Sequence, residues 1–178
     1  MALVCHPSPW YNKRKAIRIK DYNYSTCGAY FITVCTHERA ELFGKVGVPS
    51  EVTDKIKEVF ENVLSESPQI RCPQYVVMPN HLHALLVVDT IACTSDITVS
   101  DFVRVFKSKS TVAYIRLVKA GKTKPFAGKL WQRSYYDHVI RNEQDFQEVW
   151  KYIEENPYPE HIKEKLFNEI KKLELTPT

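Results

Sequence analysis

The sequence lacks several features that would assign the chain to common classes of protein. No run of 18 apolar residues occurs, so the sequence predicts no membrane-spanning helix. The apolar stretch in MALVCHPSPWYNKRK is too short for a signal peptide. The five cysteines are odd in number and form no CxxC pair, which disfavours a zinc ribbon. These absences predict a cytoplasmic protein with reduced thiols.

The length and composition predict one globular domain. The 178 residues suffice for a proper core, and 44% of them are apolar while 26% are charged. We find no internal repeat and no low-complexity segment. We therefore expect a single domain over 1–178, divided into a basic arm (1–20), a core (21–141) and C-terminal helices (142–178).

The net charge of +4 is distributed unevenly. Residues 101–133 hold nine Lys or Arg and a single acid, and residues 13–20 hold five more bases. From Asp137 to the end, ten acids face six bases. This asymmetry favours a polyanion bound on one side, and the alternative is a solvated helix face.

The hydrophobic periodicity predicts a ferredoxin-like α+β fold. Alternation and β-branched residues indicate four strands, whereas a 3.6-residue period and the capping residues Ser50 and Asn142 indicate helices between and after them. The order β-α-β-β-α-β is the split βαβ pattern, with two helices on one face of a four-stranded antiparallel sheet. The other face must be covered or used. The expected strands are 28–36, 70–78, 81–88 and 130–140, and the expected helices are 49–67, 98–119, one ending near Pro157 and one from about Glu160.

Two histidines interrupt the apolar run VVMPNHLHALLVV (76–88). Residues i and i+2 of a strand point to the same face, so His81 and His83 project together. Two neutral imidazoles side by side form a natural half of a metal site. The alternative is a pair of core histidines bonded to backbone or carboxylate groups.

A helix near the C-terminus offers further candidates in WKYIEENPYP (150–159). Tyr152 and Asn156 are four residues apart and lie on one helix face, beside the apolar stripe rather than at its centre. The carbonyl oxygen of Asn156 suits a hard cation. The alternative is a surface tyrosine and an asparagine that ends the helix.

These motifs resemble the HUH-type single-tyrosine transposases, and most closely the REP-associated tyrosine transposases (RAYTs). MPNHLH followed by YIEENP carries the resemblance, and THERAELFG (36–44) and WQRSYYDHVIRNEQDF (131–146) extend it. One departure is Tyr158-Pro159-Glu160, where many RAYTs have a basic residue after Asn-Pro. The resemblance implies Mg²⁺ or Mn²⁺ held by His81, His83 and Asn156. It also implies cleavage and rejoining of hairpin-bearing single-stranded DNA, with Tyr152 as the nucleophile that forms a 5′-phosphotyrosine.

The basic segments predict where DNA would bind. Phosphate contacts add salt-dependent affinity, and exposed aromatic rings can stack on unpaired bases. Tyr135 and Tyr136 alternate on their strand, so at most one of them faces a cleft. Tyr136 is also the rival nucleophile, His138 shares its strand face and could lie near the site, and Trp131 is better interpreted as core. The predicted DNA contacts are Lys13, Arg14, Lys15, Arg18, Arg104, Lys107, Lys109, Arg116 and Tyr136.

Two other functions remain open at this stage. One is a catalytically silent DNA-binding module of the same fold, and the other is a metal-dependent phosphodiesterase that forms no covalent adduct. A trapped protein–DNA adduct separates the transposase from both. We expect a monomer or a homodimer, associated with the bacterial nucleoid in the cytoplasm and with no membrane partner.

Overall fold

The computed structural model describes residues 27–46, 48–89 and 97–156. The helix expected from about Glu160 lies outside these residues, as does the basic arm that contains Lys13, Arg14, Lys15 and Arg18. Within the described ranges, no helix is both long and apolar enough to cross a lipid bilayer.

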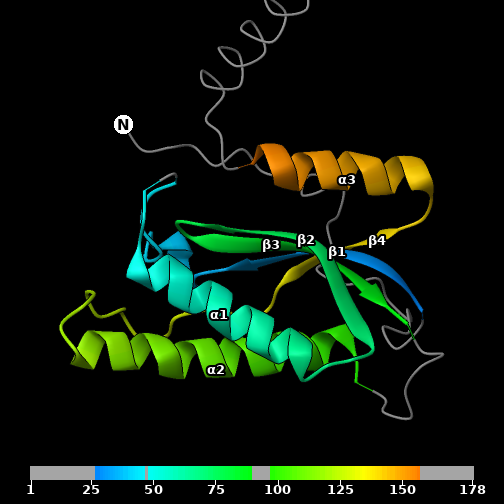
Figure 1. Cartoon of the computed structure of the whole chain (residues 1–178). Coiled ribbons are helices and arrows are strands. Elements are labelled where there is room, and N and C mark those ends of the chain that lie inside the picture. Colours follow the sequence, from blue (N-terminus) through cyan, green and yellow to red (C-terminus); the bar gives the residue numbers. More distant parts are fainter. Residues whose placement is uncertain (1–26, 47, 90–96, 157–178) are drawn as a thin grey trace, which may run out of the picture.

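The chain forms one four-stranded antiparallel sheet with helices on both faces (Figure 1). The strands lie in the order β2-β3-β1-β4, and the antiparallel pairs are β2 with β3, β3 with β1, and β1 with β4. The sequence order is that of the predicted split βαβ fold, which is confirmed. The strands are β1 (Gly28–Cys35), β2 (Ile70–Met78), β3 (His81–Val88) and β4 (Tyr136–Ile140), and the helices are α1 (Glu51–Ser65), α2 (Val99–Lys119), α3 (Glu143–Glu155) and the short 3₁₀ helix η2 (His37–Arg39).

Side-chain caps fix where the three long helices begin. Ser50 accepts a hydrogen bond from the backbone of α1, and Asn142 accepts one from the backbone of α3 at 2.9 Å, as the sequence predicted. Thr98 and Asp101 form a reciprocal capping box at the start of α2. Each cap satisfies backbone N–H groups that lack partners within their helix.

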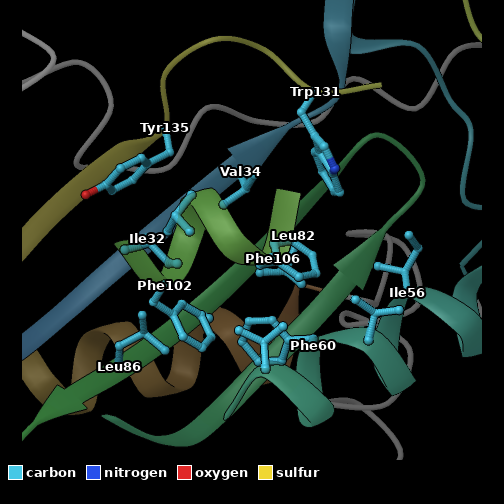
Figure 2. Close-up of a cluster of buried hydrophobic side chains, with 14 of the residues drawn as sticks. Ile32, Val34, Ile56, Phe60, Leu82, Leu86, Phe102, Phe106, Trp131 and Tyr135 are labelled. Atoms are coloured by element: carbon cyan, nitrogen blue, oxygen red, sulfur yellow. The ribbon is translucent and has the colours of Figure 1, made fainter. Parts of the chain in front are cut away.

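The main core fills the space between the sheet and the helices α1 and α2 (Figure 2). Alternate residues of β1, namely Tyr30, Ile32 and Val34, point to this side and are fully buried. Phe60 of α1 packs edge-on against Phe102 and Phe106 of α2, with ring centroids 5.6 and 5.4 Å apart. Because such rings bury large apolar areas, this layer carries most of the apolar burial.

Helix α3 covers the opposite face of the sheet from α1 and α2 (Figure 1). Its contact is a small apolar cluster in which Val149 and Ile153 pack on Phe31 and Leu85. Helix α3 therefore covers this face through a smaller apolar cluster than the one beneath α1 and α2.

The strand predicted over 130–140 is shorter than expected, because β4 begins only at Tyr136. Trp131 instead forms an isolated bridge with Thr36, and its buried indole N–H donates to Ser110 Oγ at 2.9 Å. Its place in the core agrees with the interpretation of the sequence. After Gln132, whose N–H still donates to the Cys35 carbonyl of β1, the carbonyl groups of residues 132–134 bond a lysine of α2.

Lys107 holds this turn together. Its ammonium group donates to the carbonyl oxygens of Gln132, Arg133 and Ser134 at 2.9, 3.4 and 2.8 Å. We expect Lys107→Met to lower the free energy of unfolding by about 2 kcal/mol, since charge-assisted bonds to three carbonyls are lost while the aliphatic stem is kept. Urea unfolding measures the change. Lys119→Met, at an exposed position on the same helix, is the control, and equal midpoints for the two variants would contradict the clamp.

The outer strand β2 is irregular in its first half. Its pairing with β3 shifts register between Arg71 and Gln74, and the exposed Pro73 lies between these two residues. Proline has no N–H to donate, so it is tolerated at an edge strand or a bulge and not in a central strand.

Candidate active site

The two histidines of β3 lie side by side on the α3 face of the sheet. His83 is in register with Thr33 of β1, and His81 is in register with Cys35. Both side chains are only 3% exposed, and their Nε2 atoms lie 3.0 Å apart. The predicted same-face projection of the pair is thus confirmed.

Hydrogen bonds fix how each imidazole is oriented. The Asn80 side chain donates from Nδ2 to the carbonyl of Arg39 at 3.3 Å, so its Oδ1 faces His81 Nδ1 at 2.6 Å and accepts a hydrogen bond from it. His83 Nδ1 lies 2.8 Å from Thr33 Oγ1, and the backbone of Ile32 also bonds this ring. Protonation at Nδ1 directs both Nε2 lone pairs toward one point, as is usual for metal-binding histidines.

The spacing of the two Nε2 atoms fits a small octahedral cation. Adjacent ligands of an octahedral ion at about 2.1 Å lie roughly 3.0 Å apart, which matches the observed separation. Within the described part of the chain, no group of three His, Cys, Asp or Glu side chains is arranged to hold a metal. Further ligands would therefore be an amide oxygen, water or substrate, which are the ligands that Mg²⁺ accepts readily.

Burial keeps both rings neutral. Removal from water, together with the nearby positive charge of Arg39, lowers the pKa of His81 to about 4. For His83, burial and the neighbouring His81 hold the pKa well below its ordinary value. Both rings are therefore neutral at physiological pH, which is the protonation state that a metal-binding histidine requires.

The same pKa values predict that acid destabilises the metal-free chain. His81 titrates near 6.5 when unfolded and at about 4 when folded, so the unfolded chain binds more protons between these pH values. Stability therefore falls as pH falls through this window, by about 2 to 3 kcal/mol from pH 7 to 4.5. Urea unfolding in EDTA at both pH values measures the loss. His81→Asn should reduce it, and an unchanged loss in that variant would contradict the assignment.

Tyr152 of α3 is the tyrosine in contact with this pair. Its hydroxyl lies 3.5 Å from His83 Nε2, and the two ring centroids are 5.3 Å apart. Phe31 stacks on His83 at 5.1 Å and meets the Tyr152 ring edge-on at 5.8 Å. Phe31 thus positions the histidine and the tyrosine relative to each other.

The start of α3 is anchored by His138. Its Nε2 lies 2.8 and 2.9 Å from the two carboxylate oxygens of Asp145, and both side chains are mostly buried. Asp145 precedes Tyr152 by seven residues, or about 10 Å along a helix. His138 therefore fixes the start of the helix on which Tyr152 stands, and its proximity to the histidine pair stays a prediction.

Asn156 is the residue after α3 and stands one turn beyond Tyr152. Its backbone N–H donates to the carbonyl of Tyr152 at 3.0 Å, and its side chain is half-buried. Among the described residues, no hydrogen bond joins this side chain to His81 or His83. Its role as a metal ligand stays a prediction.

The rival tyrosine, Tyr136, lies on the same face of the sheet as the histidine pair, two strands away from it. It is in register with Thr33, which is in register with His83, so two strand spacings, or about 10 Å, separate its backbone from that histidine. Tyr135 points the other way into the main core, with its hydroxyl 3.0 Å from Ser100 Oγ. As predicted, only one of the two tyrosines faces the site.

The predicted DNA contacts on α2 lie on the opposite face of the sheet from the histidines (Figure 1). Arg104 pairs with Asp101 at 3.2 Å, Lys109 pairs with Glu66, and Arg116 is exposed. Together with Lys107, whose bonds are internal, these residues are not brought to the histidine pair. The cation that does act on both histidines is Arg39, in the THERA segment, which sequence reasoning used only for family resemblance.

Known proteins share both the sequence pattern and the fold. The family described as Transposase IS200 like matches residues 24–156. An uncharacterized protein of Haemophilus influenzae is 32% identical over 159 residues, covering 81% of this chain and 88% of its own length. A solved REP-associated tyrosine transposase bound to a REP hairpin matches with a TM-score of 0.56 at 21% identity, over 79% of this chain and 72% of that one. A putative transposase from Deinococcus radiodurans matches with a TM-score of 0.50 at 22% identity, over 78% and 96%.

The fold and these matches define the class as a transposase-like, DNA-processing protein. The chain belongs to the IS200-like transposase family. This confirms the family inferred from the MPNHLH and YIEENP motifs.

Proposed function

We propose that the protein cleaves and rejoins single-stranded DNA through a covalent bond to Tyr152, with the aid of a divalent cation. One observation carries the proposal: His81 Nε2, His83 Nε2 and the Tyr152 hydroxyl converge, with separations of 3.0 and 3.5 Å. A hydroxyl beside two neutral nitrogen ligands is what nucleophilic attack on a metal-bound phosphodiester requires.

The reaction balances without an external energy source. The Tyr152 oxygen attacks the phosphorus, the bond to the 3′ oxygen breaks, and the leaving strand takes up a proton as a free 3′-OH. The new 5′-phosphotyrosine keeps the bond energy, so a second 3′-OH can attack it and release Tyr152. Mg²⁺ or Mn²⁺ held by His81, His83 and Asn156 would neutralise the phosphate oxygens and polarise the phosphorus.

The proposed substrate is single-stranded DNA that carries a hairpin. The related REP-associated transposase was solved with a REP hairpin, and the basic residues of this chain suit a polyanion. Arg104, Lys109 and Arg116 would contact DNA that passes behind the sheet, away from the chemistry. The basic arm and Tyr136 remain proposed contacts as well.

A labelled-strand assay tests the proposal. Hairpin-bearing DNA labelled at the 5′ or 3′ end is incubated with the protein and Mn²⁺, and products are separated on a denaturing gel. We expect a covalent adduct that retains the strand on the 5′-phosphate side of the cut. Tight binding of several genomic hairpins without any adduct would instead identify a silent DNA-binding module.

A further inference from the structure

The turn after β1 holds two successive residues in an unfavourable backbone conformation. Glu38 and Arg39 have φ angles of 53° and 54°, in the left-handed region that favours glycine. For residues with a side chain, each such conformation costs roughly 1 to 3 kcal/mol, and it persists only where the surroundings impose it. Strain of this kind gathers at functional sites, so the turn warrants a functional explanation.

Buried hydrogen bonds impose the conformation. The Thr36 side chain is fully buried, and its hydroxyl lies 2.8 Å from the Ala40 carbonyl and 2.9 Å from the Asn80 carbonyl. The backbone N–H of Arg39 donates to Thr36 at 3.1 Å, and that of Leu42 donates to Pro79 at 2.8 Å. The turn is thereby locked to the segment that leads into the first histidine.

A single amide joins the turn to the histidine pair. Asn80 donates from Nδ2 to the Arg39 carbonyl at 3.3 Å and faces His81 Nδ1 with its Oδ1 at 2.6 Å. The Arg39 side chain is exposed, while its charge is felt by both buried imidazoles. An exposed arginine therefore stands on a backbone locked to the segment that enters the histidine pair, whereas the cations of α2 lie behind the sheet (Figure 1).

We propose that Arg39 binds the DNA phosphate that the histidine site acts upon. This inference rests on the proposed function and adds a residue to it. A guanidinium offers parallel N–H donors that match two phosphate oxygens, which a point charge on lysine does not reproduce. The locked turn places the backbone of Arg39 one amide side chain away from His81 before DNA arrives, so only the arginine side chain has to be ordered on binding.

Two variants of Arg39 and one control variant test the proposal. Arg39→Asn removes the charge while keeping a residue that tolerates the left-handed conformation, and Arg39→Lys keeps the charge without the planar fork. The matched control is Arg71→Asn, an exposed arginine at the far end of β2. Mn²⁺ affinity and the melting temperature are recorded for each, because a metal-holding or purely structural role would change them.

The first readout is the affinity for single-stranded DNA, measured by fluorescence anisotropy in EDTA at a series of salt concentrations. Loss of one phosphate contact should reduce the slope of log K against log salt by about 0.7 in Arg39→Asn. The second readout is single-turnover cleavage, which we expect to fall about 100-fold, with Arg39→Lys recovering part of the loss. Arg71→Asn should match wild type in both.

The outcomes separate this inference from the proposed function. A wild-type chain that binds DNA but forms no Tyr152 adduct would refute the proposed function, while the salt slope would still decide on Arg39. An unchanged slope in Arg39→Asn overturns the phosphate contact, as does wild-type protein that binds no single-stranded DNA. A fall in Mn²⁺ affinity that accounts for the whole rate loss would also overturn it.

Discussion

Replacing Tyr152 by phenylalanine is expected to abolish DNA cleavage and the covalent adduct, with a loss of at least about 10⁴-fold in single-turnover rate. Only the hydroxyl can become the phosphodiester oxygen, so no other group of the side chain replaces it. The ring contacts with Phe31 and His83 are kept in the variant. We therefore expect DNA affinity and the melting temperature to stay close to wild type.

The matched control for this variant is Tyr136→Phe. Tyr136 lies on the same face of the sheet but two strands from His83, so cleavage should continue at a rate within a few-fold of wild type. Quenched reactions with end-labelled DNA, separated on denaturing gels, measure both rates. An adduct that survives in Tyr152→Phe and is lost in Tyr136→Phe would reverse the assignment of the nucleophile.

Replacing His81 by alanine should remove metal-dependent cleavage, by about 10³-fold or more, and leave much of the salt-dependent DNA binding intact. One of the two converging nitrogens disappears, so the cation loses a ligand and the phosphate charge is no longer neutralised. Binding depends chiefly on lysines and arginines elsewhere, which the variant retains. Cleavage across a Mn²⁺ titration and anisotropy without metal measure the two effects.

Two further measurements make this test decisive. His37→Ala, which changes a more exposed imidazole outside the pair, should leave the dependence on Mn²⁺ unchanged. The melting temperature of His81→Ala shows whether it is folded, since removing a buried ring also leaves a cavity and the Asn80 oxygen without its partner. Mn²⁺-dependent cleavage at the wild-type rate in a folded His81→Ala protein would show that the histidines do not hold the metal.

The fold could be predicted from the sequence because its signals are local. The apolar stripe of α1, including Ile56 and Phe60, is buried as its 3.6-residue period indicated. The exception is the start of β4, where the aromatic run around Trp131 has the composition of a strand. There, a tertiary bond from Lys107 determined the conformation, and no local pattern reveals a partner 25 residues away.

The site was predictable only in part. A period of two places His81 beside His83, but contact with Tyr152 depends on how α3 docks on the sheet. The partners Thr33 and Asn80 depend on strand register and on the preceding turn, which composition does not specify. The cations of α2 were predicted to contact DNA from their number and spacing along the sequence, without regard to which face of the sheet α2 covers. If two helices cover one face and the histidines point to the other, α2 lies behind the chemistry.

The irregular edge of β2 bears on how copies of the protein meet. A regular outer strand exposes a row of unpaired N–H and C=O groups that can recruit a strand from another molecule. Pro73 has no N–H to contribute to such a row, and the register shift beside it interrupts the regular spacing of the strand. Edge-to-edge pairing of two sheets is therefore discouraged along the first half of β2. Copies of the chain that gather on one DNA are thus less prone to join through this part of the sheet.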